Sequence, residues 1–151
     1  MAVQASSEIV IGAPPELIME ALADMDAVPL WSAVHKRVEV VDKNPDGRPH
    51  HVKVTIAVTG IHDTELLEYH WGPDWMVWDA AKTAQQHGQH GEYNLIRESD
   101  DKTRVRFTLT VEPSAPLPEF WVSRARKKIL RSALEGLRDR VMGADGAAPP
   151  R

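Results

Sequence analysis

The sequence of 151 residues contains no cysteine, only two phenylalanines and two tyrosines, and no excess of basic residues. Without cysteine there is no disulfide, zinc ribbon, cysteine-ligated iron–sulfur cluster or thiol nucleophile. The apolar runs are far shorter than the roughly 18–20 residues that a membrane-spanning helix requires. The first eleven residues lack the basic start and long apolar stretch of a secretory signal. We therefore expect a cytoplasmic protein with no membrane span.

The charge and composition describe one globular domain. There are 18 basic and 22 acidic residues, so the formal charge is −4, which argues against a nucleic-acid partner. A hydrophobic share of 42% is enough to build a core. No repeat or internal linker divides the chain. We expect a single domain over residues 1–142 and a flexible tail of small residues and prolines over residues 143–151.

The pattern of apolar residues predicts an α+β fold. After a first strand that ends at Gly12, prolines at positions 14 and 15 open a short helix, and a second short helical segment reaches Trp31. Alternating stretches such as Val52–Val58 then predict strands that are joined by short turns, so the sheet is antiparallel. From Glu119 to Met142 apolar residues recur every fourth position, which predicts one long helix packed on the sheet.

Several short motifs occur along the chain in a characteristic order. They are Ala13-Pro14 after the first strand, Pro29-x-Trp31 in the helical corner, Gly91-x-Tyr93-x-Leu95 and Thr103-x-Val105 in the last strands, and a proline-rich entry to the final helix. In this order the chain resembles the START-like (helix-grip) superfamily of polyketide cyclase/dehydrase and lipid-transport proteins. The resemblance covers residues 6–142 and is greatest to small actinobacterial cyclase-like proteins.

The resemblance implies the helix-grip architecture, in which a curved antiparallel sheet wraps around a long C-terminal helix, with two short helices after the first strand. It also implies a cavity between the sheet and that helix for a small apolar or lipid-like molecule. We chose candidate ligand-binding residues by inward strand parity and, for two tryptophans, by the resemblance. They are Trp31, Ile56, Tyr69, Trp78, Tyr93, Phe107 and Trp121.

Tryptophan is the abundant aromatic residue, with five copies against four of phenylalanine and tyrosine together. Trp31, Trp78 and Trp121 fall in regions that surround the cavity in the resembling fold, where they either contact a ligand or simply pack the core and rim. Trp71 and Trp75 flank a hairpin turn, and packing is the favoured interpretation for both.

The seven histidines raise the question of a metal site, and we predict none. On regular strands His87 and His90 point to opposite faces, as do the adjacent His50 and His51. A zinc site needs convergent ligands, and no helical HExxH motif supplies them. No phosphate loop or dinucleotide fingerprint is present either, so we expect no cofactor.

Acid–base catalysis has candidates but no assigned catalytic residue. A general acid or base must lie inside the cavity with a tuned pKa. The polar strand residues considered for this role are Glu68, His70, Asp79, His90 and Glu92.

Two functions therefore stay open. The first is binding of a small apolar or lipid-like molecule, and the alternative is a cyclase or dehydratase that acts on a polyketide-like substrate. An interaction module on the same fold is a weaker third. The basic cluster at residues 124–128 is predicted to be a solvated helix face. The sequence does not predict the oligomeric state.

Overall fold

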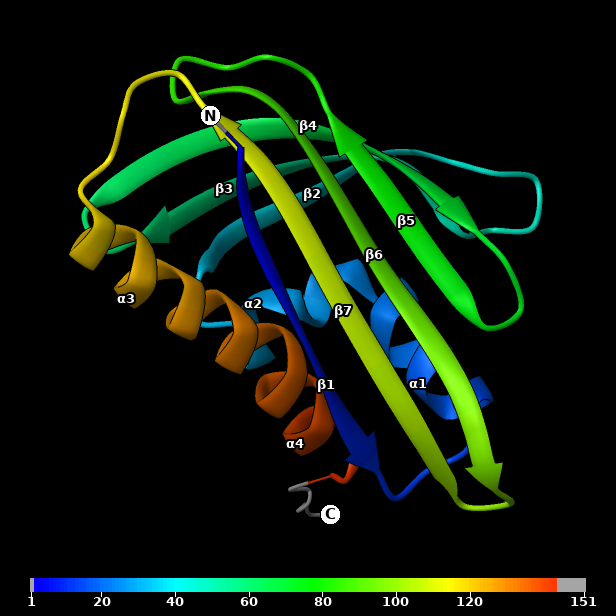
Figure 1. Cartoon of the computed structure of the whole chain (residues 1–151). Helices are drawn as coiled ribbons and strands as arrows, with labels where there is room; N and C mark the ends of the chain where they lie inside the picture. The colour runs from blue at the N-terminus through cyan, green and yellow to red at the C-terminus, as the bar shows by residue number, and fades with distance from the viewer. Residues whose placement is uncertain (1, 144–151) are drawn as a thin grey trace.

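Seven strands form one antiparallel sheet in the computed structural model, which describes residues 2–143. The spatial order is β1-β7-β6-β5-β4-β3-β2, so only β1 pairs out of sequence order (Figure 1). The predicted meander is therefore confirmed. The strands are β1 (Val3–Ile11), β2 (His35–Lys43), β3 (Pro49–Val58), β4 (Ile61–Trp71), β5 (Trp75–Ala80), β6 (Gln86–Ser99) and β7 (Lys102–Pro113).

The helices follow the predicted order. Helix α1 (Pro15–Ala23), the 3-10 turn η1 (Met25–Ala27) and α2 (Val28–Trp31) lie between β1 and β2. The C-terminal helix consists of α3 (Glu119–Leu130), the π-helical segment η2 (Arg131–Gly136) and α4 (Leu137–Val141) without a break in the helical path. We refer to these three segments together as the C-terminal helix.

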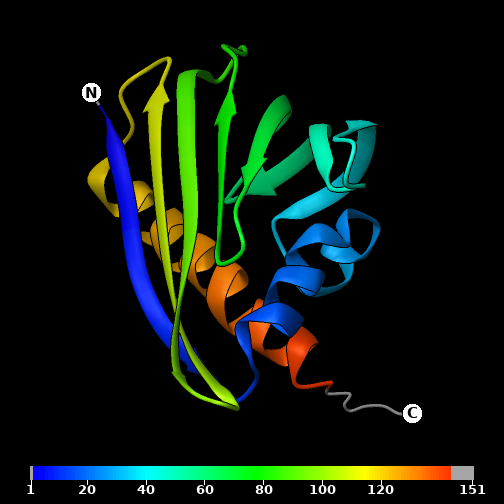
Figure 2. The ribbon, with the colours of Figure 1, turned by 90° about the vertical axis from the view of Figure 1, so that its right-hand side faces the viewer.

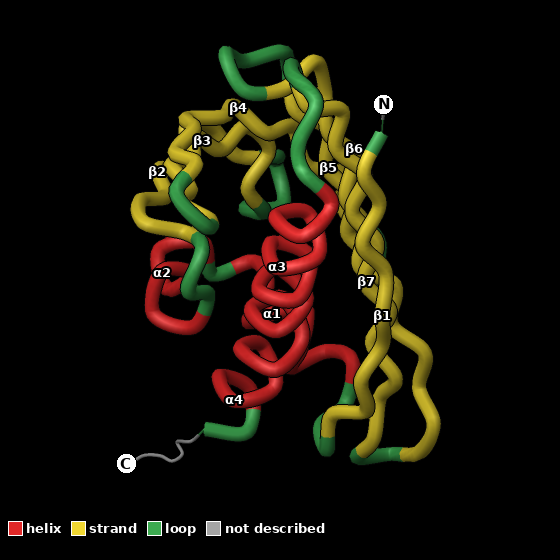
Figure 3. Tube along the Cα trace, turned by 60° about the vertical axis from the view of Figure 1, so that its left-hand side comes forward, coloured by secondary structure: helices red, strands yellow, loops and turns green. Residues whose placement is uncertain are grey.

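The sheet bends around the C-terminal helix. In Figure 3 the helix lies between β2, β3 and β4 on one side and β1, β6 and β7 on the other. Figure 2 shows it running obliquely across the strands on one face of the sheet, with α1 and α2 beside its C-terminal end. This is the helix-grip arrangement, an α+β fold with one curved sheet and one long helix on its concave face.

The main core forms where the concave face meets α1 and the end of the C-terminal helix. Ile11, Ile18, Val105 and Leu137 have no solvent exposure and belong to one connected hydrophobic cluster. They come from β1, α1, β7 and α4, so burial of their apolar surface holds the sheet and helices together.

The π-helical segment packs closely against both α2 and the sheet. A Cβ atom built on Gly136 would lie 2.2 Å from the carbonyl oxygen of Trp31, so only glycine fits against α2 there. On the sheet side, the hydroxyl of Tyr93 donates a hydrogen bond of 2.9 Å to the carbonyl oxygen of Ala133. The helix is thereby fixed between α2 and β6.

The chain ends and boundaries differ slightly from prediction. The predicted final helix closes at Val141 rather than Met142, and β1 begins earlier than the apolar alternation indicated. The predicted tail, residues 143–151, lies outside the described residues except for Gly143. No helix within residues 2–143 is long and apolar enough to span a membrane. The cytoplasmic location stays a prediction.

The packing of the C-terminal helix is testable by truncating Leu137. Because this side chain is fully buried, Leu137→Ala should lower the free energy of unfolding by about 2–5 kcal/mol. The matched control is Leu30→Ala in α2, since Leu30 is 77% exposed and its truncation should change stability by less than about 0.5 kcal/mol. Urea denaturation measures both values, and equal midpoints for the two variants would contradict this packing.

Candidate functional site

Two chambers lie between the concave face of the sheet and the C-terminal helix. The first, of about 110 Å³, is walled by aromatic side chains from β4, β5, β6 and β7 and by residues of α1 and α2, and we call it the aromatic chamber. The second, of about 220 Å³, is mainly aliphatic and lies beneath the N-terminal half of α3, and we call it the aliphatic chamber. Together they reach the lower end of the ~300–1,000 Å³ range of small-molecule sites.

The chambers share one wall, which we call the junction. It combines apolar side chains of β3, β7 and α3 with two polar side chains of β4 and β6. The residues that line both chambers are Ile56, Val58, Glu65, Gln89, Leu109 and Ile129.

Four aromatic rings form the sheet side of the aromatic chamber. The ring centroids of Tyr69 and Trp78 are 5.7 Å apart, and those of Tyr93 and Phe107 are 5.0 Å apart. Trp78 links the two pairs at 6.1 Å from both Tyr93 and Phe107. These separations are within the ~4.5–7 Å range of favourable aromatic contacts, so the wall is a rigid apolar surface.

Gly91 allows Trp78 to lie across β6. The two residues are paired in register, and a Cβ atom on Gly91 would come within 2.1 Å of the indole ring. The Gly91-x-Tyr93 motif therefore leaves space for one ring and supplies the next one along the same face of the strand. This is a physical reason for that motif in the sequence.

Glu65 carries a carboxyl group at the junction with very little solvent contact. The residue is 4% exposed, and its Oε2 accepts a hydrogen bond of 2.9 Å from Gln86 Nε2. Gln89 Nε2 lies 3.4 Å from both carboxylate oxygens, and the Oε1 of Gln89 accepts a hydrogen bond of 2.8 Å from the indole of Trp78. We call Glu65, Gln86 and Gln89 the polar cluster.

The environment of Glu65 shifts its protonation into the neutral range. Burial disfavours the charged carboxylate and, with the nearby Asp63, raises its pKa from 4.5 to about 7, although the two glutamine amides act in the opposite direction. Burial, helped by the charge of Glu65, also raises the pKa of Tyr69, which therefore keeps its proton. The site thus holds a carboxyl group that can exchange a proton near neutral pH.

A second polar group lies at the helical corner of the aromatic chamber. Burial lowers the pKa of His35 to about 4, so the imidazole is neutral at physiological pH, and its Nδ1 is 2.7 Å from the hydroxyl of Ser32. Within residues 2–143, Trp31 Nε1 is one of two buried side-chain polar atoms that have no hydrogen-bond partner. Both His35 and Trp31 line the aromatic chamber.

All seven predicted ligand-binding residues line a chamber. Trp121 lines the aliphatic chamber, with its indole donating to the carbonyl oxygen of Thr59 at 2.9 Å, and Ile56 lies at the junction. The hydroxyl of Tyr93 is already bonded to the helix backbone, so only its ring is free to contact a ligand. Contact with a ligand stays a prediction for each. The five on the aromatic chamber alone are Trp31, Tyr69, Trp78, Tyr93 and Phe107.

The polar residues considered for acid–base catalysis lie on the convex face instead. Their strand parity is opposite to that of Tyr69, Trp78 and Tyr93, and their side chains are 40% to 63% exposed. They do not meet the requirement that a general acid or base lie inside the cavity, because each has the outward parity of its strand. The residues concerned are Glu68, His70, Asp79, His90 and Glu92.

Inward strand parity in the sequence also points to the polar cluster, which was not among the predicted site residues. Glu65 alternates with Leu67 and Tyr69 on the same face of β4, so inward parity places a carboxylate among apolar side chains. Gln89 has the same relation to Tyr93 on β6. The burial of His35 at the start of β2 had no comparable signal, since it depends on how α2 meets the sheet.

The prediction that the adjacent His50 and His51 point to opposite faces of the sheet is wrong. The register of β2 and β3 shifts between Asp42–His51 and Lys43–Pro49, which makes His50 the extra residue of a bulge. The rings of His50 and His51 then lie together, with centroids 4.1 Å apart, instead of on opposite faces.

Of the remaining tryptophans, Trp71 is half-buried and packs against the main core, whereas Trp75 and the basic cluster lie nearer the surface. Trp71 donates from its indole to the carbonyl oxygen of Pro49 at 2.6 Å, and Trp75 is 36% exposed. On α3, Arg124, Lys127 and Lys128 are exposed, as expected for the outer face of a packed helix.

The raised pKa of Glu65 predicts a pH-dependent stability. The folded state holds this proton more tightly than the unfolded chain, so its stabilising contribution is complete below pH 4.5 and is lost as the pH rises to about 7. Glu65→Gln removes the titration. The free energy of unfolding of the variant relative to the wild type should therefore rise by up to roughly 3 kcal/mol over this range, as measured by urea denaturation at several pH values.

The control is Glu39→Gln, at an exposed position on β2. Glu65 is unchanged in this variant, so the variant should lose stability between pH 4.5 and about 7 as the wild type does. A constant offset for Glu65→Gln across the whole range would mean that the pKa of Glu65 is the same in the folded and the unfolded protein.

Solved structures share this architecture over nearly the whole chain. A START superfamily protein from Mycobacterium smegmatis matches with a TM-score of 0.82 and 19% identity, covering 93% of this chain and 98% of that one. A protein from Thermus thermophilus matches with a TM-score of 0.81 and 22% identity over the same shares. The Zhui aromatase/cyclase from Streptomyces sp. R1128 has a TM-score of 0.77 and 16% identity over 98% of both chains. At these identities the likeness concerns the fold.

The sequence also matches a family across the domain. The match to the family described as polyketide cyclase / dehydrase and lipid transport extends over residues 2–142. It includes every strand and helix and all the residues that line the two chambers. The chain therefore belongs to the polyketide cyclase / dehydrase and lipid transport family.

Proposed function

We propose that the protein binds a small molecule with an apolar body and one polar group in the two chambers. The observation that carries this proposal is the position of the polar cluster, which lies at the junction of two chambers with mostly apolar walls. Binding sites for small molecules commonly combine apolar walls with a few fixed polar groups that orient the ligand.

The chemistry of the polar cluster supports a ligand that exchanges hydrogen bonds. The amides of Gln86 and Gln89 are donors, and the carboxyl of Glu65 can donate or accept according to its protonation. A hydroxyl, phenol or carbonyl group on the ligand would fit these partners. At the other end of the aromatic chamber, Trp31 Nε1 offers a further donor that has no partner within the described residues.

The walls supply the affinity. Burying about ten methylene equivalents at ~0.8 kcal/mol each gives roughly 8 kcal/mol, which corresponds to a micromolar dissociation constant. Loss of ligand and side-chain freedom reduces this value. We therefore expect weak, broad binding of apolar compounds, with the four rings of the sheet wall and Ile56 making most of the contact and Trp31 and Trp121 lying at the two ends.

Blocking the junction tests the binding proposal. Ile56 lines both chambers, so Ile56→Phe should weaken binding of fatty acids, sterols or flat polycyclic phenols by at least tenfold, because the larger ring occupies the shared space. Binding is followed by intrinsic tryptophan fluorescence, since three tryptophans line the chambers.

The matched control is Ile96→Phe on β6, where the isoleucine is 40% exposed. This variant should bind like the wild type. The proposal is wrong if none of these compounds gives a saturable signal with the wild type, or if both variants lose binding equally.

A cyclase or dehydratase activity on a polyketide-like substrate is the second candidate. One observation favours it: Glu65, with a pKa of about 7, is suited to give or take a proton inside an apolar cavity. The fold is also that of the Zhui aromatase/cyclase, although the identity of 16% extends no further than the fold.

Glu65→Gln separates the two candidates when binding and turnover are measured on the same compound. For an enzyme, conversion of a poly-ketone should fall by about 10²–10⁴-fold while the dissociation constant changes little. Mass spectrometry of the reaction mixture gives the conversion. Absence of conversion by the wild type, with binding intact, would leave binding as the function.

A further inference from the structure

A cluster of nitrogen and oxygen ligands lies outside the chambers, on the convex surface of the sheet. Three histidines and two carboxylates from adjacent strands lie close together there, and all five side chains are exposed or half-buried. They form two overlapping groups that share His50: Asp42 on β2 with His50 and His51 on β3, and His50 with Glu68 and His70 on β4.

The β2–β3 bulge brings these side chains together. His51 is paired in register with Asp42 on one side and Glu68 on the other, so these three share the convex face. His70 follows Glu68 two positions along β4 and has the same parity. The bulge turns His50 onto this face as well, and its ring centroid lies 5.9 Å from that of His70.

Glu68 is the common neighbour of the three imidazoles. Its Oε2 lies 3.0 Å from His70 Nε2 and 3.8 Å from His50 Nε2, and its Oε1 lies 3.8 Å from His51 Nε2. Two ligand atoms bound tetrahedrally to one zinc ion at ~2.0–2.1 Å lie about 3.3 Å from each other. The observed separations lie on both sides of this value, so the side chains must rotate to bring the ligand atoms to this spacing.

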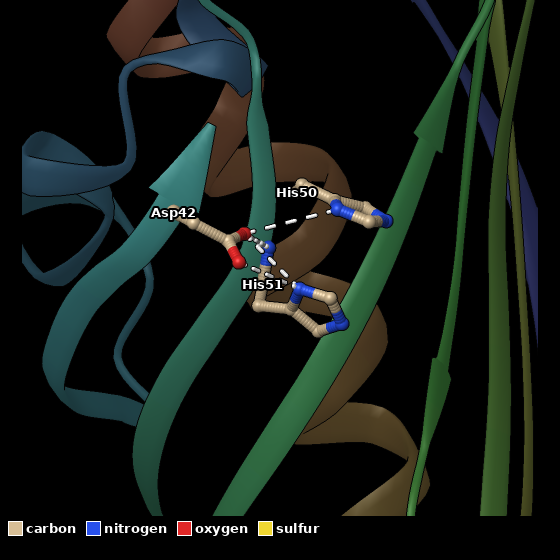
Figure 4. Close-up of side chains that lie close together, drawn as sticks. All are labelled: Asp42, His50 and His51. Atoms are coloured by element: carbon tan, nitrogen blue, oxygen red, sulfur yellow. Dashed lines mark hydrogen bonds and ion pairs between the residues drawn. The ribbon is translucent and has the colours of Figure 1, made fainter. Parts of the chain in front are cut away.

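Asp42 orients two of the histidines from the other side. Its Oδ1 is 3.0 Å from His51 Nδ1 and 3.8 Å from His50 Nδ1, and it also accepts a hydrogen bond of 2.9 Å from the backbone N–H of His51 (Figure 4). A proton held on Nδ1 by Asp42 leaves Nε2 of His51 as the basic nitrogen. Carboxylates orient metal-bound histidines in this way in known metal sites.

We propose that this cluster is a binding site for a divalent transition metal of the zinc type. His50 and His70 ligate through Nε2 and Glu68 through its carboxylate, and one ligand atom of each already lies within 4.8 Å of the others. His51 lies beside this group, with its Nε2 3.8 Å from Glu68 Oε1, and Asp42 orients both His50 and His51. Imidazole nitrogens favour zinc, nickel and copper over magnesium or calcium. The site is independent of the chambers, since it lies on the opposite face of the sheet.

Isothermal titration of the full chain with zinc chloride in a non-chelating buffer at neutral pH tests the site. The wild type should bind one equivalent saturably, and bound zinc should raise the melting temperature. His50→Ala and His70→Ala should each abolish this binding. Asp42→Asn should weaken it by about 10–100-fold, the effect expected of a residue that orients the ligands.

The matched controls are His87→Ala and His90→Ala, which remove histidines from β6. Nε2 of His90 is 2.9 Å from Glu92 in a separate network, so both controls should bind zinc like the wild type. Circular dichroism verifies folding, and His70→Gln provides a milder change at the same position.

The proposal is overturned if the wild type binds no zinc saturably at micromolar concentrations. It is equally overturned if folded His50 and His70 variants keep the wild-type affinity, or if His90→Ala removes the binding. Magnesium binding in place of zinc would also contradict a site built on imidazoles.

Discussion

A single long helix must cover the concave face of a seven-stranded sheet, and it covers this face only in part. Close to the C-terminus the contact is tight: Leu137 is fully buried, and Gly136 meets the backbone of Trp31 with no space for a side chain. Beneath the N-terminal half of α3, side chains fill the space between the helix and the strands less completely, and the aliphatic chamber lies there. Both the core and the cavity therefore follow from the oblique course of the C-terminal helix across the sheet.

The polar cluster is the point at which this packing departs from an ordinary apolar core. A carboxyl group as buried as Glu65 costs stability unless it is protonated or bonded, and here both the raised pKa and the bond from Gln86 reduce that cost. Proteins rarely place such a group between apolar walls without a use for it, so its position supports a ligand with a polar group or a proton-transfer step.

The two faces of the sheet differ in their chemistry. Along the convex face, Asp42, His51, Glu68, Asp79 and His90 are successive cross-strand partners across β2, β3, β4, β5 and β6. Glu68 and Asp79 are carboxylates placed opposite each other, and like charges in directly opposite positions are unfavourable. His51 precedes this pair in the row, and His90 follows it. The proposed metal site lies on the side of His51, and on the other side His90 pairs with Asp79.

The sequence by itself determined the order of strands and helices and the inward residues of the wall, such as Tyr69, because alternation and the four-residue stripe are local patterns. The same alternation places Glu65 on the inner face, whereas the polar residues named as catalytic candidates have outward parity. Only the tertiary structure decided the contacts that depend on register and on the helix position. The bulge turns His50 onto the convex face against the parity of a regular strand. The burial of His35 and the bond from Tyr93 to the helix arise where segments far apart in the chain meet. No local sequence pattern predicts such long-range contacts, because they depend on how the helix packs against the sheet.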